Sequence, residues 1–293
     1  MHENALVRLP PEAVVNHLAD WAIQRLRQWW PGCGSDLCEY VPCVYVDGDG
    51  EYKADLDDLD RDEAEERGWQ VDNDPRWQGE EIGTDEVTSQ DAYGKRKVVD
   101  VEVRVESDPM GGWLSGFYDR KQGPGGTLAI VFNWSRFDDV CSILKPGHWE
   151  DKTRPMRLVR AVVAHELTHA FGPHKVRLDE LADPHDPYIA GLPWEREAWQ
   201  KQYMTGPDER DAFARELFQR LKDMWLYVDD SWNGESYPFA LQRQLLEDED
   251  GEHLGLFLNA LAPADKKQVV VDVGRGMRLF VRRQIRRRRL GRT

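Results

Sequence analysis

An apolar run that ends in three ionisable residues restricts the fold of this chain more than any other feature. Residues 158–164 are mostly Leu, Val and Ala, and they lead directly into His165-Glu166-Leu167-Thr168-His169. Thr153 is a suitable N-cap and Gly172-Pro173 is a stop signal, so the pattern predicts one helix over about 153–171. Such a helix is apolar enough to be buried. Burying two histidines and a glutamate on it is costly without a compensating ion.

The spacing of the two histidines favours a metal site. Residues four apart on an α-helix leave the same face one turn apart, so His165 and His169 suit two nitrogen ligands of one tetrahedral zinc ion. Glu166 projects beside them, where its carboxylate can accept a proton from a zinc-bound water, whose pKa falls to about 7. The pentapeptide therefore predicts Zn2+ as cofactor and Glu166 as catalytic base. The structural alternative is a helix with satisfied core histidines.

A catalytic zinc ion needs a third protein ligand and one open position. The segment after the motif is rich in carboxylates and also holds histidines. The candidates taken from it are His174, Asp179, Glu180, Asp183, His185, Asp186, Glu195 and Glu197.

At this point the chain resembles the gluzincin metallopeptidases, in which a glutamate on a second helix follows the motif and is often followed by Ala three positions later. Glu195-Arg196-Glu197-Ala198 matches, so the resemblance implies Glu195 as the third ligand, with Trp199 where the family has Asp or Asn. Glu197 and His174 remain alternatives. The resemblance covers Arg154 to Tyr203 and is greatest to the compact zincins encoded by phages and mobile elements.

The resemblance also implies a substrate site. In such enzymes a peptide binds as an extended strand against the edge of a sheet, and Thr127 to Trp134 resembles that edge strand. A second electrophile would assist zinc at the developing oxyanion. Tyr203, His185, Tyr188 and Tyr237 are the candidates.

The remaining pattern predicts an α+β fold: a zincin-like domain with a small mixed sheet and a helical C-terminal extension. Strands are expected at 98–105, 113–118 and 127–134, with a shorter one near 39–46. Helices are expected at 11–30, 194–204, 208–228, 238–247 and from about 268. We expect a metallopeptidase domain over 1–205, with an acidic insertion at about 47–97, and the extension over 206–293.

Charge is distributed unevenly in this chain of net charge −15. Residues 47–91 hold eighteen acidic residues against four basic ones, whereas Arg275 to Thr293 holds nine arginines and no acid. Arg282 to Arg289 therefore forms a basic tail that could bind nucleic acid. The alternatives are a solvated tail or a tail that pairs with the acidic segment.

Few features point to export or to a membrane. The N-terminus has no signal-peptide pattern and no apolar stretch approaches bilayer length. Cys33, Cys38, Cys43 and Cys141 do not form the paired pattern of a zinc ribbon, so we interpret them as reduced thiols. These observations predict a cytoplasmic protein that is not in a membrane.

Together the motif and the resemblance predict a zinc metalloendopeptidase that acts on a protein or peptide substrate. A catalytically silent zincin that serves as a binding or regulatory module, on nucleic acid through the basic tail, is the principal alternative. A metal hydrolase with a different substrate is another. Glu166 favours an enzyme over a silent scaffold, since a scaffold has no need of that carboxylate.

Overall fold

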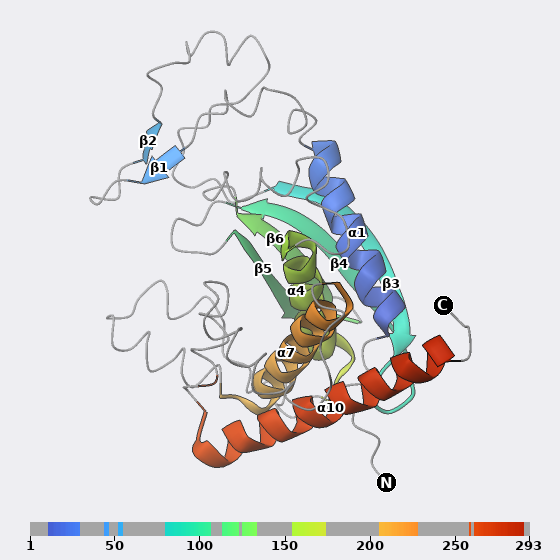
Figure 1. The fold of residues 1–293 in the computed structure, drawn as a ribbon. Coiled ribbons are helices and arrows are strands. Elements are labelled where there is room, and N and C mark those ends of the chain that lie inside the picture. Colours follow the sequence, from blue (N-terminus) through green and yellow to red (C-terminus); the bar gives the residue numbers. More distant parts are fainter. Residues whose placement is uncertain are drawn as a thin grey trace.

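The structure is a computed structural model, and it describes residues 11–29, 44–46, 52–54, 80–106, 113–122, 125–133, 154–173, 205–227, 258 and 261–289. Within these ranges the fold is α+β, as predicted, with four helices and a four-stranded mixed sheet (Figure 1). The helices are α1 (Glu12–Trp29), α4 (Arg154–Phe171), α7 (Pro207–Tyr227) and α10 (Pro263–Arg289). The strands are β1 (Val44–Val46), β2 (Tyr52–Ala54), β3 (Glu80–Gln90), β4 (Arg96–Glu106), β5 (Leu114–Asp119) and β6 (Thr127–Asn133).

The main sheet has the strand order β3-β4-β6-β5, and β1 and β2 form a separate antiparallel pair. β4 runs parallel to β6, while β3 and β5 run antiparallel to their neighbours. β4 follows the predicted alternation, because Val99, Val101, Val103 and Val105 are buried and the residues between them are not. This alternation directs one face of the strand into the core.

The predicted edge position of residues 127–134 is wrong. β6 lies between β4 and β5, so among the described strands β5 is at the edge on that side of the sheet. β6 is buried from Leu128 to Asn133 without alternation, which is the pattern of an interior strand covered on both faces. β5 is mostly half-buried, as expected of an edge.

β3 forms in a part of the chain that we had expected to be an acidic loop. Its Ile82 and Val87 face the core, and its acidic residues, such as Asp85 and Glu86, lie outside it. Charged side chains on an outer strand discourage pairing with other chains. The acidic composition is therefore compatible with an edge strand.

The described helices lie in layers beside the sheet. α1 and α4 pack on each other and on the sheet, and together these elements form the larger core cluster. α7 packs against α4, and α10 packs against α7 through a second apolar cluster (Figure 1). Apart from α10, which starts at Pro263, these helices begin and end within a few residues of their predicted bounds. The predicted helices at 194–204 and 238–247 fall outside the described residues.

The C-terminal end of α4 is anchored to the sheet. Lys97 on β4 donates a hydrogen bond to the carbonyl oxygen of Ala170 at 2.7 Å, and the Ala92 amide donates to Phe171 at 2.8 Å. These donors satisfy carbonyl groups that the last turn of a helix leaves unpaired. They hold the motif helix in a fixed position relative to β4.

No described helix is long and apolar enough to cross a bilayer.

We predict that Lys97→Met lowers the free energy of unfolding by about 1–3 kcal/mol, because the carbonyl of the buried Ala170 loses its donor. Lys95→Met is the matched control, since the Lys95 side chain is exposed. Urea denaturation of both variants measures the difference. Equal stabilities would contradict the anchoring role of Lys97.

Candidate metal centre

Two imidazoles from α4 converge at the interface of α4 with α7. The Nε2 atoms of His165 and His169 lie 3.2 Å apart, and the ring planes meet at 61°. His165 is only 8% exposed. The predicted same-face arrangement of the two histidines is thus confirmed, and both rings point their Nε2 atoms into one small space.

α7 contributes a carboxylate to the same space. Glu209 lies in the first turn of α7, and its two oxygens are 3.1 Å from His169 Nε2 and 3.4 Å from His165 Nε2. Like His165, it is 8% exposed. One donor atom from each of His165, His169 and Glu209 lies within 4.8 Å of the others, so these three residues form a group that could hold a metal ion.

The separations of the donor atoms fit a zinc site. Zinc–ligand bonds of about 2.0–2.1 Å at tetrahedral angles place neighbouring ligand atoms roughly 3.3 Å apart. His165 Nε2 and His169 Nε2 lie 3.2 Å apart, and each lies 3.1–3.4 Å from a different oxygen of Glu209. With a single Glu209 oxygen, the three donor atoms all lie within 4.8 Å of one another. Two imidazoles and one carboxylate are also a known catalytic donor set that leaves a fourth position for water.

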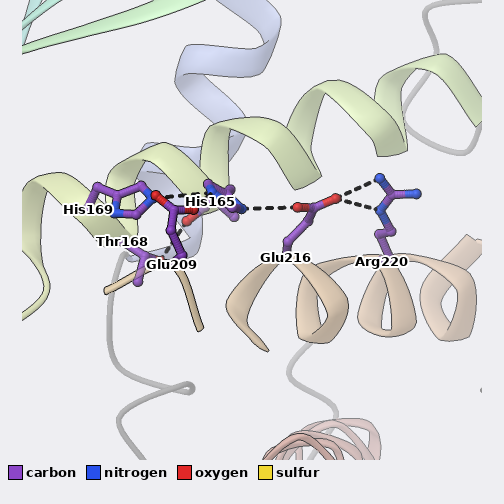
Figure 2. Close-up of polar contacts among 7 residues, drawn as sticks. His165, Thr168, His169, Glu209, Glu216 and Arg220 are labelled. Carbon is purple, nitrogen blue, oxygen red and sulfur yellow. Dashed lines mark hydrogen bonds and ion pairs between the residues drawn. The ribbon is translucent and has the colours of Figure 1, made fainter. Parts of the chain in front are cut away.

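A second carboxylate of α7 orients His165 from behind (Figure 2). Glu216 Oε2 lies 3.0 Å from His165 Nδ1, and its other oxygen accepts two hydrogen bonds from Arg220, at 2.6 and 3.1 Å. A carboxylate at Nδ1 favours a ring proton there, which leaves Nε2 as the atom that a metal ion can bind. Metal-bound histidines are commonly oriented in this way.

The charges of the group are strongly coupled. Burial acts to lower the pKa of His165, yet its hydrogen bonds to Glu209 and Glu216 outweigh burial and raise that pKa well above its ordinary value. Burial acts to raise the pKa of Glu209, but the facing charge of His169 and hydrogen bonds with both imidazoles hold it far below the usual range. The carboxylates therefore attract positive charge to this space. A metal ion would compete there with protons.

Glu166 lies beside the two imidazoles, and it is 5% exposed. Burial raises the pKa of its carboxyl group, and the neighbouring His165 and His169 act against that rise. The edge strand passes very close to it: a Cβ added to Gly116 would lie 2.8 Å from Glu166 Cγ. Glycine at this position of β5 lets the strand approach the carboxylate.

The α4–α7 interface holds a further buried ion pair, away from the imidazoles. Arg160 Nε donates to Asp223 at 2.9 Å, and both side chains are 1% exposed. Lys222 bonds to Glu12 of α1 and to Gln219 of its own helix. These contacts tie α7 to α4 and to α1, so the position of Glu209 and Glu216 relative to the histidines is fixed by paired charges.

The structure brings together part of the predicted site. His165, Glu166 and His169 lie together as expected, while Glu195, Glu197 and the other candidate ligands and electrophiles fall outside the described residues. Glu195 therefore stays a prediction. The cysteines Cys33, Cys38, Cys43 and Cys141 also fall outside these residues.

The carboxylate of Glu209 was not among the expected ligands. Its local sequence, Glu209-Arg210-Asp211-Ala212, repeats the Glu-x-x-Ala pattern that we matched at Glu195. Thirty-nine residues separate Glu209 from His169, and Glu195, the match nearer to the motif, was the expected ligand instead. A search for every copy of the pattern on a predicted helix would have found it.

We predict that Glu216→Gln weakens zinc binding roughly 10- to 100-fold, because the amide no longer holds His165 in the right tautomer and orientation. Chelator competition measures the affinity. Asp272→Asn on α10 is the control, since it removes a carboxylate of an exposed ion pair with Arg275. Equal affinities for the Glu216 variant and the native chain would contradict this role.

Comparisons with known proteins gave no match for this chain. No protein-family model matches it, and neither a curated protein nor a solved structure does. The gluzincin resemblance therefore stays an expectation carried by the residues named above.

Proposed function

We propose that this protein is a zinc-dependent metallopeptidase of the zincin type. The observation that carries the proposal is the convergence of His165 Nε2, His169 Nε2 and the Glu209 carboxylate, with the buried Glu166 next to them. Three donors and an adjacent free carboxylate are the parts that zinc-assisted hydrolysis requires.

In this proposal His165, His169 and Glu209 hold the ion. Zinc bound there would supply a Lewis acid and a nucleophilic water at neutral pH. The residues of the chain supply the remainder: Glu216 orients His165, and Glu166 accepts the proton of the water and returns it to the leaving amine. Burial raises the pKa of the Glu166 carboxyl group, which is the direction that favours a group that must accept a proton and give it back.

The position of β5 supports a peptide substrate. β6 occupies one edge of β5, and no described strand pairs with the other. An extended peptide can add to such an edge through main-chain hydrogen bonds. Because Gly116 on β5 lies against Glu166, a peptide on that edge would run beside the proposed base. An antiparallel edge strand above the motif helix also supports the zincin-like assignment.

The alternatives differ in what they require of Glu166. A silent binding module has no use for this carboxylate, and burying an ionisable group is costly. A hydrolase for another substrate would use the same donors but has no need of a free sheet edge. The edge beside Glu166 therefore favours the peptidase.

We predict that Glu166→Gln keeps zinc and lowers peptide cleavage by about 10²- to 10⁴-fold, because the water loses its proton acceptor. Cleavage of a denatured protein and zinc content by mass spectrometry are measured on the same preparation. If the variant cleaves at the native rate, Glu166 is not the base.

Glu209→Gln is expected to lose stoichiometric zinc, because an amide replaces one of three ligands. Glu195→Gln and Glu197→Gln are the matched variants, since each changes a carboxylate of the neighbouring Glu-x-x-Ala match to an amide. Zinc content and cleavage are measured for all three. Loss of zinc in the Glu195 variant, with zinc retained in the Glu209 variant, would transfer the third ligand to Glu195.

Gly116→Ala is expected to lower cleavage roughly 10- to 100-fold at unchanged zinc content, because the new methyl group displaces Glu166 and misplaces the base. Ser115→Ala is the control, since Ser115 is the exposed neighbour on the same strand. Native activity of the Gly116 variant would show that the approach of β5 to Glu166 is not needed.

A further inference from the structure

α10 has two opposite faces of different chemistry. Val269, Val273 and Met277 are buried against α7. At about 100° per residue, Arg275, Arg278, Arg282 and Arg286 fall within about 80° of one another on the side opposite to those three residues. We call these four residues the arginine stripe. All four are exposed.

The arginine stripe is not neutralised by its described surroundings. Arg275 lies 3.6 Å from Asp272, while Arg278, Arg282 and Arg286 make no ion pair or hydrogen bond with other described residues. Like charges three or four residues apart destabilise a helix by about 0.2–0.5 kcal/mol per pair. A solvated face normally mixes both signs, but Arg275 to Thr293 contains no acid. The stripe therefore calls for an anionic partner.

The dimensions of the stripe fit a regular array of phosphates. From Arg275 to Arg286 the stripe spans about 16 Å of helix axis, which corresponds to roughly five phosphates of one DNA strand at about 3.4 Å each. The stripe contains arginine and no lysine, and guanidinium groups bind phosphate oxygens in pairs. Figure 1 shows α10 crossing α7 and continuing beyond it toward its C-terminal end.

An acidic protein fits this face less well. Protein interfaces have an apolar core with aromatic anchors, whereas the large apolar side chains exposed on α10 beside the stripe are Val271, at 39%, and Ile285, at 42%, and neither is aromatic. The stripe offers charge at regular intervals on a straight, rigid element.

We propose that the arginine stripe of α10 is a docking surface for duplex DNA, which it contacts through the phosphate backbone without reading the base sequence. The surface lies on a different helix from the metal centre, so this inference is independent of the proposed peptidase function. Contacts from four arginines give log Kd a dependence on log salt with a slope of about 3.6.

Fluorescence anisotropy with a labelled 24-base-pair duplex and the full chain tests the proposal between 50 and 200 mM NaCl. The triple variant Arg278→Gln/Arg282→Gln/Arg286→Gln should bind more than about tenfold more weakly at 100 mM NaCl, with the salt slope reduced by about 2.7. Lys95→Gln/Arg96→Gln/Lys121→Gln removes the same charge from exposed positions near the sheet. This control should bind as the native chain does. Circular dichroism verifies that both variants are folded.

Three results would overturn the proposal. The first is no binding by the native chain at 50 mM NaCl, which would mean that the stripe is covered by acids of this chain or is only solvated. The second is an equal loss of affinity in both variants, which would show that binding depends on the net charge of the chain and not on the position of the arginines. The third is displacement of the duplex by a poly-glutamate peptide as readily as by unlabelled duplex, which would indicate an acidic protein partner.

Discussion

Ionisable groups buried between α4 and α7 control the arrangement of this protein. Moving a charge from water into a protein interior costs several kcal/mol per ion unless a partner compensates. At this interface His165, Glu209, Glu216, Arg160 and Asp223 are all at most 8% exposed. Each is stable only while it faces its partner, so the two helices have one acceptable register. That register brings the three candidate donors within reach of one ion.

The three buried acids of α7 that face α4 are evenly spaced along the helix. Glu209, Glu216 and Asp223 are seven residues apart, which on a helix returns to nearly the same face. On the antiparallel α4, Glu209 faces both histidines, Glu216 faces His165, and Asp223 faces Arg160. Arg220 adds a charge that holds Glu216 between two donors. The interface is therefore specified by acids of α7 that face basic groups of α4, as well as by apolar packing.

The sequence predicted local features well and distant partners poorly. α4 and β4 could be predicted because apolar periodicity and end signals act within one segment. The order of the sheet could not, since the choice between β5 and β6 as the edge depends on pairing across the fold. Glu209 was missed for the same reason. Its contact with His169 spans thirty-nine intervening residues, and the local sequence does not indicate which Glu-x-x-Ala match contacts the histidines. The heptad of acids on α7 was available in the sequence and would have marked the face that meets α4.

Because the donors come from two separate helices, an ion held between them would act as a cross-link as well as a reagent. Binding to the folded chain alone stabilises that chain by about 2.7 kcal/mol when the free ion is at one hundred times its dissociation constant. Without the ion, Glu209 and Glu216 face the imidazoles of His165 and His169, and the Arg160–Asp223 pair also holds α7 against α4. Resistance of this helix pair to unfolding would then depend on both the concentration of the ion and the pH.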